Sequence, residues 1–407
     1  MAETLRGNAL VGQSGGPTVV INQSLVGLVQ AAAGIDAITG FYGARHGVKG
    51  ILEEDLIDLR RESAATLEEV ALTPAAGLGS VRMKPKEEEC ARILEVLEAH
   101  DVRYFFYLGG NDSAETAHII ERLAADRSYD VRLFHVPKTI DNDLRVTDHC
   151  PGFGSAARFV ASAFMGDDLD NRSIPGVKID VVMGRHAGFL TAASALARRR
   201  EDDGPHLVYL PEVAFEMERF LDDVEATVSR IGRCVVAVSE GIHDAAGELI
   251  VQSAEKDSHG NVQLSGSGAL GDLLASAVKG RLGSVGRVRA DTFGYLQRSF
   301  PGFASTVDMA EARAVGVSAI EAATGGEFET GSLAIRRLVG PDGGYASENF
   351  VTPLDTVARV TKEMDPSYIN EAGNDVTDAW LDYVRPLAGE LPIIGRFEGH
   401  PIAKRLS

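Results

Sequence analysis

The heptapeptide Pro137-Lys138-Thr139-Ile140-Asp141-Asn142-Asp143 follows the largely apolar run from Val131 to Val136, which has the composition of a buried strand. The proline ends this strand because it has no amide hydrogen to donate to a neighbouring strand. In open α/β sheets, ligands bind just beyond the C-terminal ends of the strands. A lysine, a hydroxyl and two carboxylates at such a position suit phosphoryl transfer, which needs a cation, a base and a metal ligand. The same residues also suit a polar turn, so this segment alone leaves both interpretations open.

Other apolar runs of the chain also end in glycine and polar residues. The runs 9–11, 104–108, 179–183, 207–210 and 234–238 lead, in order, into Gly12–Pro17, Gly109–Ser113, Gly184–Gly188, Pro211-Glu212 and Ser239–Gly241. Helical stretches lie between them, at 87–100, 113–126 and 215–231. Alternating strands and helices predict an α/β fold with parallel sheets and right-handed crossovers. The polar strand ends should therefore converge on one edge of each sheet.

Size and composition limit the class of protein. A chain of 407 residues is long enough for two domains, each with its own core. The net charge of -19 leaves no basic surplus to neutralise phosphates, so no nucleic-acid partner is expected. The three cysteines are far apart and have no metal-binding spacing, which favours a reducing cytosol. No signal-peptide layout and no apolar run of ~18 residues is present, so we expect a cytoplasmic protein without a membrane partner.

Two glycine-rich loops indicate the kind of ligand. Gly12–Pro17 precedes a helix expected to begin near Val19 or Val20, and its small residues let a phosphate approach the helix N-terminus. This loop has neither the Gly-Lys-Ser/Thr of a P-loop nor the Gly-x-Gly-x-x-Gly of a dinucleotide site, which disfavours a nicotinamide-dependent oxidoreductase. Gly109–Ser113 opens another helix, with Asp112 or Ser113 as its predicted N-cap.

Five motifs, in this order, resemble the phosphofructokinase family, and specifically its pyrophosphate-dependent branch. They are Gly15-Gly16-Pro17, Gly109–Ser113, Pro137–Asp143, Met183-Gly184-Arg185 and Gly294-Tyr295-Leu296-Gln297-Arg298. Pro211-Glu212 and Ser239-Glu240-Gly241 lie in register between them. The resemblance covers roughly residues 8–320, and residues 381–387 are similar to the C-terminal extension of the pyrophosphate enzymes. So many ordered matches are not expected by chance.

The resemblance implies a fold and a reaction. The fold would be two Rossmann-like three-layer α/β domains with mainly parallel sheets and the active site in the cleft between them. Residues 1–152 with about 298–375 would bind pyrophosphate, about 153–297 would bind the sugar phosphate, and about 376–407 would form a C-terminal extension. The reaction would be Mg2+-dependent, reversible phosphoryl transfer from pyrophosphate to the 1-hydroxyl of fructose 6-phosphate, giving fructose 1,6-bisphosphate and phosphate.

Two alternatives within the family remain open. One is an ATP-dependent 6-phosphofructokinase. The other is a non-catalytic homologue that only binds a sugar phosphate. The presence of Asp141, Asp143, Arg185 and Lys138 argues against the second alternative, because binding alone does not need a base.

The resemblance also implies roles for individual residues. Asp141 would be the general base, kept ionised by neighbouring cations, and the other catalytic residues would be Lys138, Arg185 and Thr139. Fructose 6-phosphate would contact Thr139, Asp141, Met183, Gly184, Arg185, Glu240, Arg289, Tyr295, Arg298 and Lys178. Pyrophosphate would contact Gly15, Gly16, Arg82, Gly110, Asp112 and Lys138. Mg2+ would be bound by Asp112 and Asp143.

Two positions predict the phosphoryl donor. Relatives that use ATP have glycine where this chain has Asp112 and Lys138. An aspartate in the loop would occupy the space of the α-phosphate of ATP and repel its charge. The lysine would offer a point charge to pyrophosphate oxygens. Together the two residues predict pyrophosphate, rather than ATP, as the donor.

Departures from the family pattern affect metal binding and regulation. Asn111 stands where many relatives have a metal-associated aspartate, and a neutral amide is the poorer Mg2+ ligand, so no metal role is assigned to it. Val26, Gln30 and Asp55 stand where allosteric bacterial enzymes have arginines for a phosphorylated effector. Without those cations, we expect a non-allosteric enzyme that binds no anionic effector there.

The family also implies an oligomer. Its members place a cation from a neighbouring subunit on the 6-phosphate, and Lys178 and Arg172 are the two candidates in this chain. We therefore expect a homodimer or homotetramer whose active site is complete only in the assembly.

Overall fold

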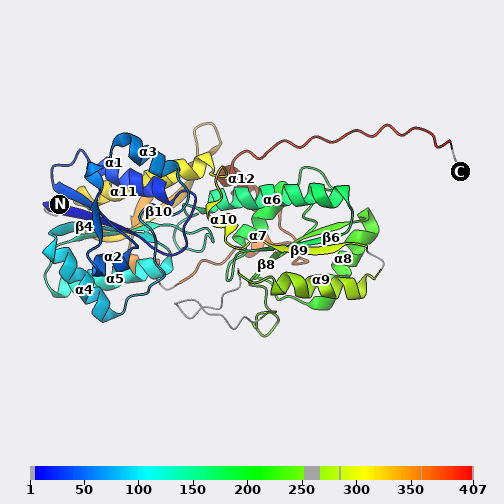
Figure 1. Cartoon of the computed structure of the whole chain (residues 1–407), viewed down its shortest axis with the longest axis horizontal. Helices are drawn as coiled ribbons and strands as arrows, with labels where there is room; N and C mark the ends of the chain where they lie inside the picture. Colours follow the sequence, from blue (N-terminus) through cyan, green and yellow to red (C-terminus); the bar gives the residue numbers. More distant parts are fainter. Residues whose placement is uncertain (1–4, 252–265, 284–285, 359, 406–407) are drawn as a thin grey trace.

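The computed structural model describes residues 5–251, 266–283, 286–358 and 360–405, which form two α/β lobes, each built on one sheet (Figure 1). The larger sheet has the strand order β11 (Tyr345–Thr352), β10 (Thr330–Val339), β5 (Arg132–Pro137), β4 (Val102–Gly109), β1 (Gly7–Gln13), β2 (Ile38–Ala44) and β3 (Leu56–Asp58). The smaller sheet has the order β7 (Leu207–Tyr209), β8 (Cys234–Ser239), β6 (Val177–Val182) and β9 (Val288–Thr292). All pairs are parallel except β2 with β3 and β10 with β11, which confirms the predicted fold class.

Helices cover both faces of each sheet (Figure 1). On the larger sheet, α1 (Ile21–Ala32), α3 (Ala64–Leu72) and α11 (Thr306–Thr324) lie on one face, and α2 (Val48–Leu52), α4 (Glu87–Ala99) and α5 (Asn111–Asp126) lie on the other. On the smaller sheet, α6 (Phe153–Ser173), α7 (Phe189–Ala193) and α12 (Asp378–Ala388) lie on one face, and α8 (Met217–Ile231) and α9 (Ala269–Arg281) lie on the other. The short helix α10 (Leu296–Ser299) lies where the two lobes meet.

The central strands are apolar along their whole length because helices cover both of their sides. Every residue of β5 and all but one residue of β4 are buried, so neither strand alternates between core and solvent. His135 lies in this core with no exposed surface, where its Nε2 donates to the Gly109 carbonyl at 2.9 Å and its Nδ1 lies 2.8 Å from the Ser332 hydroxyl. These bonds tie β5 to the end of β4 on one side and to β10 on the other.

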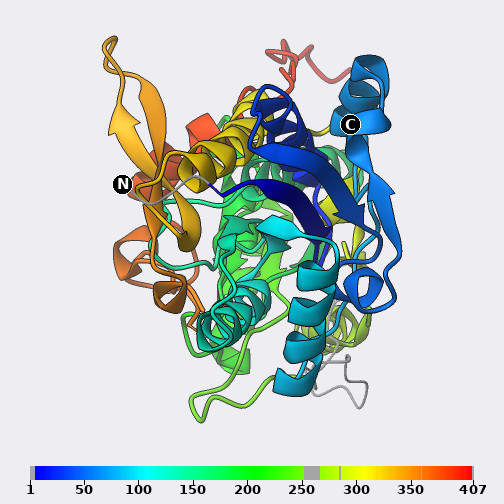
Figure 2. The ribbon, with the colours of Figure 1, turned by 90° about the vertical axis from the view of Figure 1, so that its left-hand side faces the viewer.

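The segment after α11 completes the larger sheet. β10 adds to β5 in parallel and then turns back as β11, which makes an antiparallel hairpin that projects from the body (orange in Figure 2). The next segment returns to the loop that follows β5, where Thr361 forms an isolated antiparallel bridge with Leu144.

Glycines allow two helices of the larger lobe to pack with their backbones in contact. A Cβ atom at Gly27 of α1 would lie 2.4 Å from the carbonyl oxygen of Arg313, and one at Gly316 of α11 would lie 2.2 Å from that of Ser24. Any larger residue at either position would force the helices apart.

Within the described residues, no helix is both long enough and apolar enough to cross a membrane.

A buried aspartate connects the two lobes. Asp308, in the first turn of α11, is 3% exposed and accepts hydrogen bonds from Gly152 N at 2.8 Å, Ser155 N at 2.9 Å and Ser155 Oγ at 2.6 Å. Gly152 and Ser155 belong to the start of α6, whose first amides have no partner within the helix. A helix of the larger lobe therefore caps the longest helix of the smaller lobe.

We expect the substitution Asp308→Ala to lower the free energy of unfolding by about 2 kcal/mol, because it leaves buried amide and hydroxyl donors without an acceptor. Urea denaturation followed by circular dichroism measures the change. Asp382→Ala is the matched control, since Asp382 pairs with Arg385 at the surface and its side chain is 77% exposed. Equal stability of the two variants would contradict the capping role of Asp308.

Candidate active site

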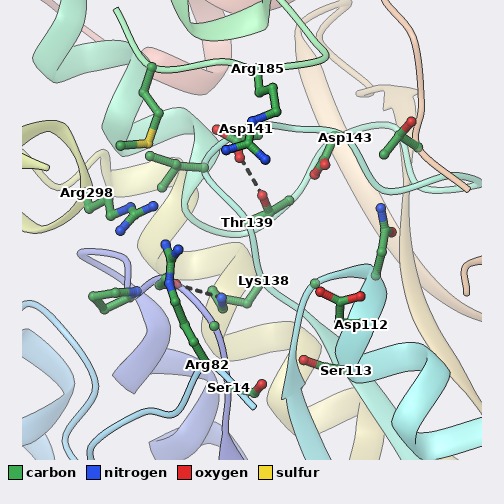
Figure 3. A pocket seen from close by; sticks show the side chains of 18 of the residues that line it. Ser14, Arg82, Asp112, Ser113, Lys138, Thr139, Asp141, Asp143, Arg185 and Arg298 are labelled. Atoms are coloured by element: carbon green, nitrogen blue, oxygen red, sulfur yellow. Dashed lines mark hydrogen bonds between the residues drawn. The ribbon is translucent and has the colours of Figure 1, made fainter. Parts of the chain in front are cut away.

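A cavity of about 530 Å³ lies between the lobes, where strand ends of both sheets meet (Figure 3). The larger sheet contributes the loops after β1, β4 and β5, and the smaller sheet contributes the loops after β6 and β8. Most of the predicted site residues line it: Gly15, Gly16, Arg82, Gly110, Asp112, Lys138, Thr139, Asp141, Asp143, Met183, Arg185, Glu240, Tyr295 and Arg298. Gly184 stands between two of these lining residues and has a φ of 144°, a conformation that side chains rarely adopt.

Lys138 directly follows β5 and is buried at the bottom of this cavity. It is 4% exposed, and its Nζ donates to the Gly16 carbonyl at 2.6 Å. Burial, and after it the positive charge of Arg298, lowers the pKa of Lys138 to about 7. An anion bound beside the ammonium group would favour its charged form.

Arg298 extends from α10 towards the loop that follows β1. Its guanidinium carbon lies 4.7 Å from the centre of the Tyr295 ring, and a Cβ atom at Gly16 would lie only 3.1 Å from the same carbon. Glycine at position 16 thus leaves room for the arginine. Burial and the charge of Arg82 lower the pKa of Arg298. Figure 3 shows Arg82, Arg298 and Lys138 directed into the same space, which favours an anionic ligand.

Asp141 presents a buried carboxylate to these cations. Its backbone N donates to the Thr139 hydroxyl at 3.1 Å, and its Oδ1 is buried with no hydrogen-bond partner among the described residues. Burial raises the pKa of Asp141, and the charges of Arg298 and Lys138 act in the opposite direction. The predicted effect of the cations is therefore present, but burial outweighs it. A buried carboxylate with a free oxygen can accept a proton from a ligand hydroxyl.

Asp143 is a second buried carboxylate in the cavity. Burial and the neighbouring charge of Asp141 raise the pKa of Asp143 to about 6. Two carboxylates that disfavour each other's charge fit a divalent cation such as Mg2+, which takes oxygen ligands. Asp112 is the weaker candidate for a metal ligand, because Lys84 Nζ lies 3.6 Å from its Oδ1 and 2.6 Å from Glu115 Oε2. Asp112 already shares its charge with a lysine.

The start of α5 also faces the cavity. The sequence predicted Asp112 or Ser113 as the N-cap, but that prediction is wrong: Gly110 is the N-cap, and the helix begins at Asn111, directly after β4. Both predicted residues therefore lie in the first helical turn. Because glycine has no side chain to cap the helix, the positive end of the helix dipole is left for a ligand.

A family model described as phosphofructokinase matches residues 8–323. The chain belongs to the phosphofructokinase family. It is 52% identical over 407 residues to the pyrophosphate--fructose 6-phosphate 1-phosphotransferase of Rhodospirillum rubrum, with 99% of each chain covered. It is 41% identical to the protein of the same name from Xanthomonas campestris pv. campestris, covering 97% of this chain and 95% of that one. The crystal structure of pyrophosphate-dependent phosphofructokinase from Nitrosospira multiformis is also similar, with a TM-score of 0.84, 36% identity and 98% coverage of both chains.

Two residues predicted from the phosphofructokinase resemblance lie outside this cavity. Lys178 and Arg289 are register partners on β6 and β9, and they line a separate cavity of about 240 Å³. Lys178 Nζ lies 3.5 Å from Asp167 and 3.4 Å from Asp180, and it also contacts Asp291. The expectation that Arg289 joins Tyr295 and Arg298 is not met within one chain. The reason is that Lys178 and Arg289 stand at the second position of their strands, whereas the active-site cavity lies beyond the C-terminal ends of parallel strands.

Arg172, the other candidate for a cation that reaches a neighbouring subunit, is held by acidic residues of its own chain. Its guanidinium lies 3.0 Å from Asp168, 2.7 Å from Asp202 and 2.9 Å from Asp203. Lys178 is held in the same way by three acidic residues of its own chain, so these contacts do not decide between Lys178 and Arg172.

Several residues that line the active-site cavity were not predicted as site residues from the sequence. They include Lys84, Glu115, His186 and Thr361. Lys84 had a usable signal, since it follows Arg82 by two positions in the same loop. Thr361 had none, because tertiary contacts such as the bridge to Leu144 bring this segment from the far end of the chain to the cavity.

The pKa of Lys138 leads to a prediction for anion affinity. A lysine with a pKa of about 7 is charged below that pH and neutral above it, so we expect the affinity for pyrophosphate, used as a probe anion, to fall as the pH rises through about 7. Once the lysine titrates, the loss is up to about tenfold per pH unit. Calorimetric titration between about pH 6 and about pH 9 measures it.

Lys138→Arg is the matched control, because an arginine stays charged over this range and the probe's own titration affects both proteins equally. Parallel pH profiles for the two proteins would contradict the assignment to Lys138.

Proposed function

We propose that this chain is a pyrophosphate-dependent 6-phosphofructokinase, which transfers a phosphoryl group from pyrophosphate to the 1-hydroxyl of fructose 6-phosphate. The observation that carries the proposal is a cavity in which Arg82, Lys138 and Arg298 face Asp141, a buried carboxylate whose Oδ1 has no hydrogen-bond partner in the described part of the chain. The names of the full-length relatives agree with it.

The proposed reaction is a displacement at phosphorus. Asp141 accepts the proton of the 1-hydroxyl, and the hydroxyl oxygen forms a bond to one phosphorus of pyrophosphate. The bond from that phosphorus to the bridging oxygen breaks, and phosphate leaves. Lys138 and Arg185 balance the negative charge of the transferring group, and Thr139 orients it. Such transfer depends mainly on alignment and on neutralisation of charge.

The substrates are assigned to the two lobes. Pyrophosphate would lie against Gly15, Gly16, Arg82, Gly110, Asp112 and Lys138, and the sugar phosphate against Met183, Gly184, Glu240, Tyr295 and Arg298. An arginine suits the 6-phosphate because its planar group donates two parallel hydrogen bonds. The domain division predicted from the family follows the same assignment, since residues of the larger sheet meet the donor and residues of the smaller sheet meet the sugar.

Mg2+ is the proposed cofactor. Asp143, with Asp112, would bind it, and the ion would neutralise charge on the phosphate oxygens. Because Asp112 also pairs with Lys84, Asp143 is the stronger of the two candidate ligands.

The choice of pyrophosphate over ATP rests on the two positions that differ from ATP-using relatives. Asp112 stands in the first turn of α5, on the cavity wall, and Lys138 faces the loop after β1. In this arrangement the aspartate takes up space and negative charge beside the donor, and the lysine supplies positive charge. Pyrophosphate and the sugar ester are close in group-transfer potential, so the step would run in both directions and serve glycolysis and gluconeogenesis.

The proposed enzyme is a cytoplasmic homodimer or homotetramer. The three cysteines are buried and unpaired, as expected in a reducing compartment. Lys178 and Arg289, which lie outside the active-site cavity of their own chain, would serve the 6-phosphate of a neighbouring subunit. The absence of an anionic effector site stays a prediction.

Initial rates with fructose 6-phosphate and Mg2+ test the donor. We expect turnover with pyrophosphate and little with ATP. The double substitution Asp112→Gly with Lys138→Gly should weaken the use of pyrophosphate and admit some ATP, because it removes both the obstruction and the replacement charge. Full pyrophosphate activity in the double variant would contradict the role of these two residues, and turnover with ATP alone would overturn the donor assignment.

Mixed oligomers test the contribution of a neighbouring subunit. Asp141→Ser and the double variant Lys178→Ala with Arg289→Ala should each be inactive alone. In a random mixture of the two in a dimer, one site in four pairs an intact base with intact cations, so we expect about a quarter of wild-type activity. A mixture that stays inactive, while thermal unfolding shows both variants folded, would contradict the sharing of these cations.

A further inference from the structure

The loop that carries Asp141 and Asp143 is tied to the C-terminal helix by the residue between them. Asn142 has no exposed surface and a φ of 58°, a left-handed conformation that asparagine tolerates better than most residues. Its Oδ1 accepts from Cys150 N at 3.1 Å, and its Nδ2 donates to the hydroxyl of Tyr383 at 2.9 Å. Tyr383 in turn donates to the Asp148 carbonyl at 2.7 Å. One tyrosine of α12 thus contacts both the middle and the end of the loop.

The position of Tyr383 is fixed by the core of the smaller lobe. Its ring centre lies 5.4 Å from that of Trp380, which has no exposed surface and packs against Phe153 of α6 and Phe189 of α7. Burial raises the pKa of the Tyr383 hydroxyl well above its ordinary value, which keeps it a neutral donor and acceptor. The loop therefore rests against a helix that packs into the core of the smaller lobe.

A second contact allows the role of this hydroxyl to be isolated. Lys362 donates from its backbone N to the Asp143 carbonyl at 2.7 Å and from Nζ to the Asp148 carbonyl, also at 2.7 Å. Removal of the Tyr383 hydroxyl therefore leaves the Asp148 carbonyl with a partner. The bond that is lost without replacement is the one to Asn142.

We infer that Tyr383 is a positioning residue of the active site, which fixes the direction of Asp141 and Asp143 by bonding Asn142. The inference rests on the proposed function, because it assigns the two carboxylates to the reaction. The C-terminal extension is then part of the catalytic structure, since it supplies the support for a loop more than 200 residues earlier in the chain. Tyr383 is not among the described residues that line the active-site cavity, so its effect should appear in the rate of the chemical step rather than in binding.

The variant Tyr383→Phe tests this inference, because it removes one oxygen and keeps the packed ring. We expect kcat with pyrophosphate and fructose 6-phosphate to fall by between about tenfold and about a hundredfold, because a small displacement of the reacting groups slows a reaction by that order. Both KM values should stay within about twofold of wild type. Tyr368→Phe is the matched control, since Tyr368 packs against Trp380 and Tyr383 in the same cluster but belongs to no hydrogen bond with the loop among the described residues. Its kcat should be unchanged.

The route through Asn142 is tested in a double variant. Asn142→Gly keeps the left-handed backbone and removes the amide, so Tyr383→Phe should cause no further loss of kcat in that background. Losses that multiply would mean that Tyr383 acts by another route and would overturn the inference. So would an unchanged kcat in Tyr383→Phe, or a rise in KM with a loss of stability equal to that of Tyr368→Phe.

Hydrogen exchange separates this inference from the proposed function. We expect backbone amides between residues 141 and 150 to exchange faster in Tyr383→Phe than in wild type or Tyr368→Phe. This result does not depend on which reaction the enzyme catalyses. Absence of turnover in the wild-type enzyme would reject the proposed function alone. Unchanged exchange in Tyr383→Phe would reject the support of the loop by α12.

Discussion

The active site depends on one electrostatic constraint, which is that several cations are buried close together in a chain with a net charge of -19. Burial, and after it the charge of Arg298, lowers the pKa of Lys138 to about 7, and burial with the charge of Arg82 lowers the pKa of Arg298. The free-energy cost of holding these positive charges close together is offset by the folding of both lobes, and not by the binding of a substrate. An anion that enters the cavity finds the positive groups already placed, which is the general condition for electrostatic stabilisation of a reaction.

The parallel sheets make this arrangement possible. Strand ends of the larger sheet present Gly16 and Lys138, and the turn at Met183 to Arg185 follows a strand of the smaller sheet. Because each loop begins where a buried strand stops, its first residues have little freedom. The absence of a side chain at Gly16 then lets Arg298 approach the opposite lobe. Two buried contacts between distant segments, at Asp308 and at Tyr383, tie the start of α6 and the carboxylate loop to other parts of the chain.

Local patterns in the sequence predicted the fold class and the strand ends, and the resemblance to the phosphofructokinase family predicted most of the cavity lining. Apolar runs that stop at proline or glycine mark strands, and the polar residues after them mark the site. The N-cap of α5 was predicted wrongly. Gly110 takes that position without a side-chain cap, and the helix begins at Asn111. The placement of Arg289 with Tyr295 was not met in one chain, because a motif gives the order of residues but not the end of the strand on which each one stands.

The sequence by itself determined which charged groups this protein can offer: carboxylates at Asp141 and Asp112, and cations at Lys138 and Arg298. These are properties of residue type and of spacing within short segments. Only the tertiary structure decided how strongly each group holds its proton, that Lys84 neutralises part of Asp112, and that α12 supports the carboxylate loop. The physical reason is that burial and hydrogen bonds depend on contacts between segments that are separate in the sequence, and local sequence carries no record of those contacts.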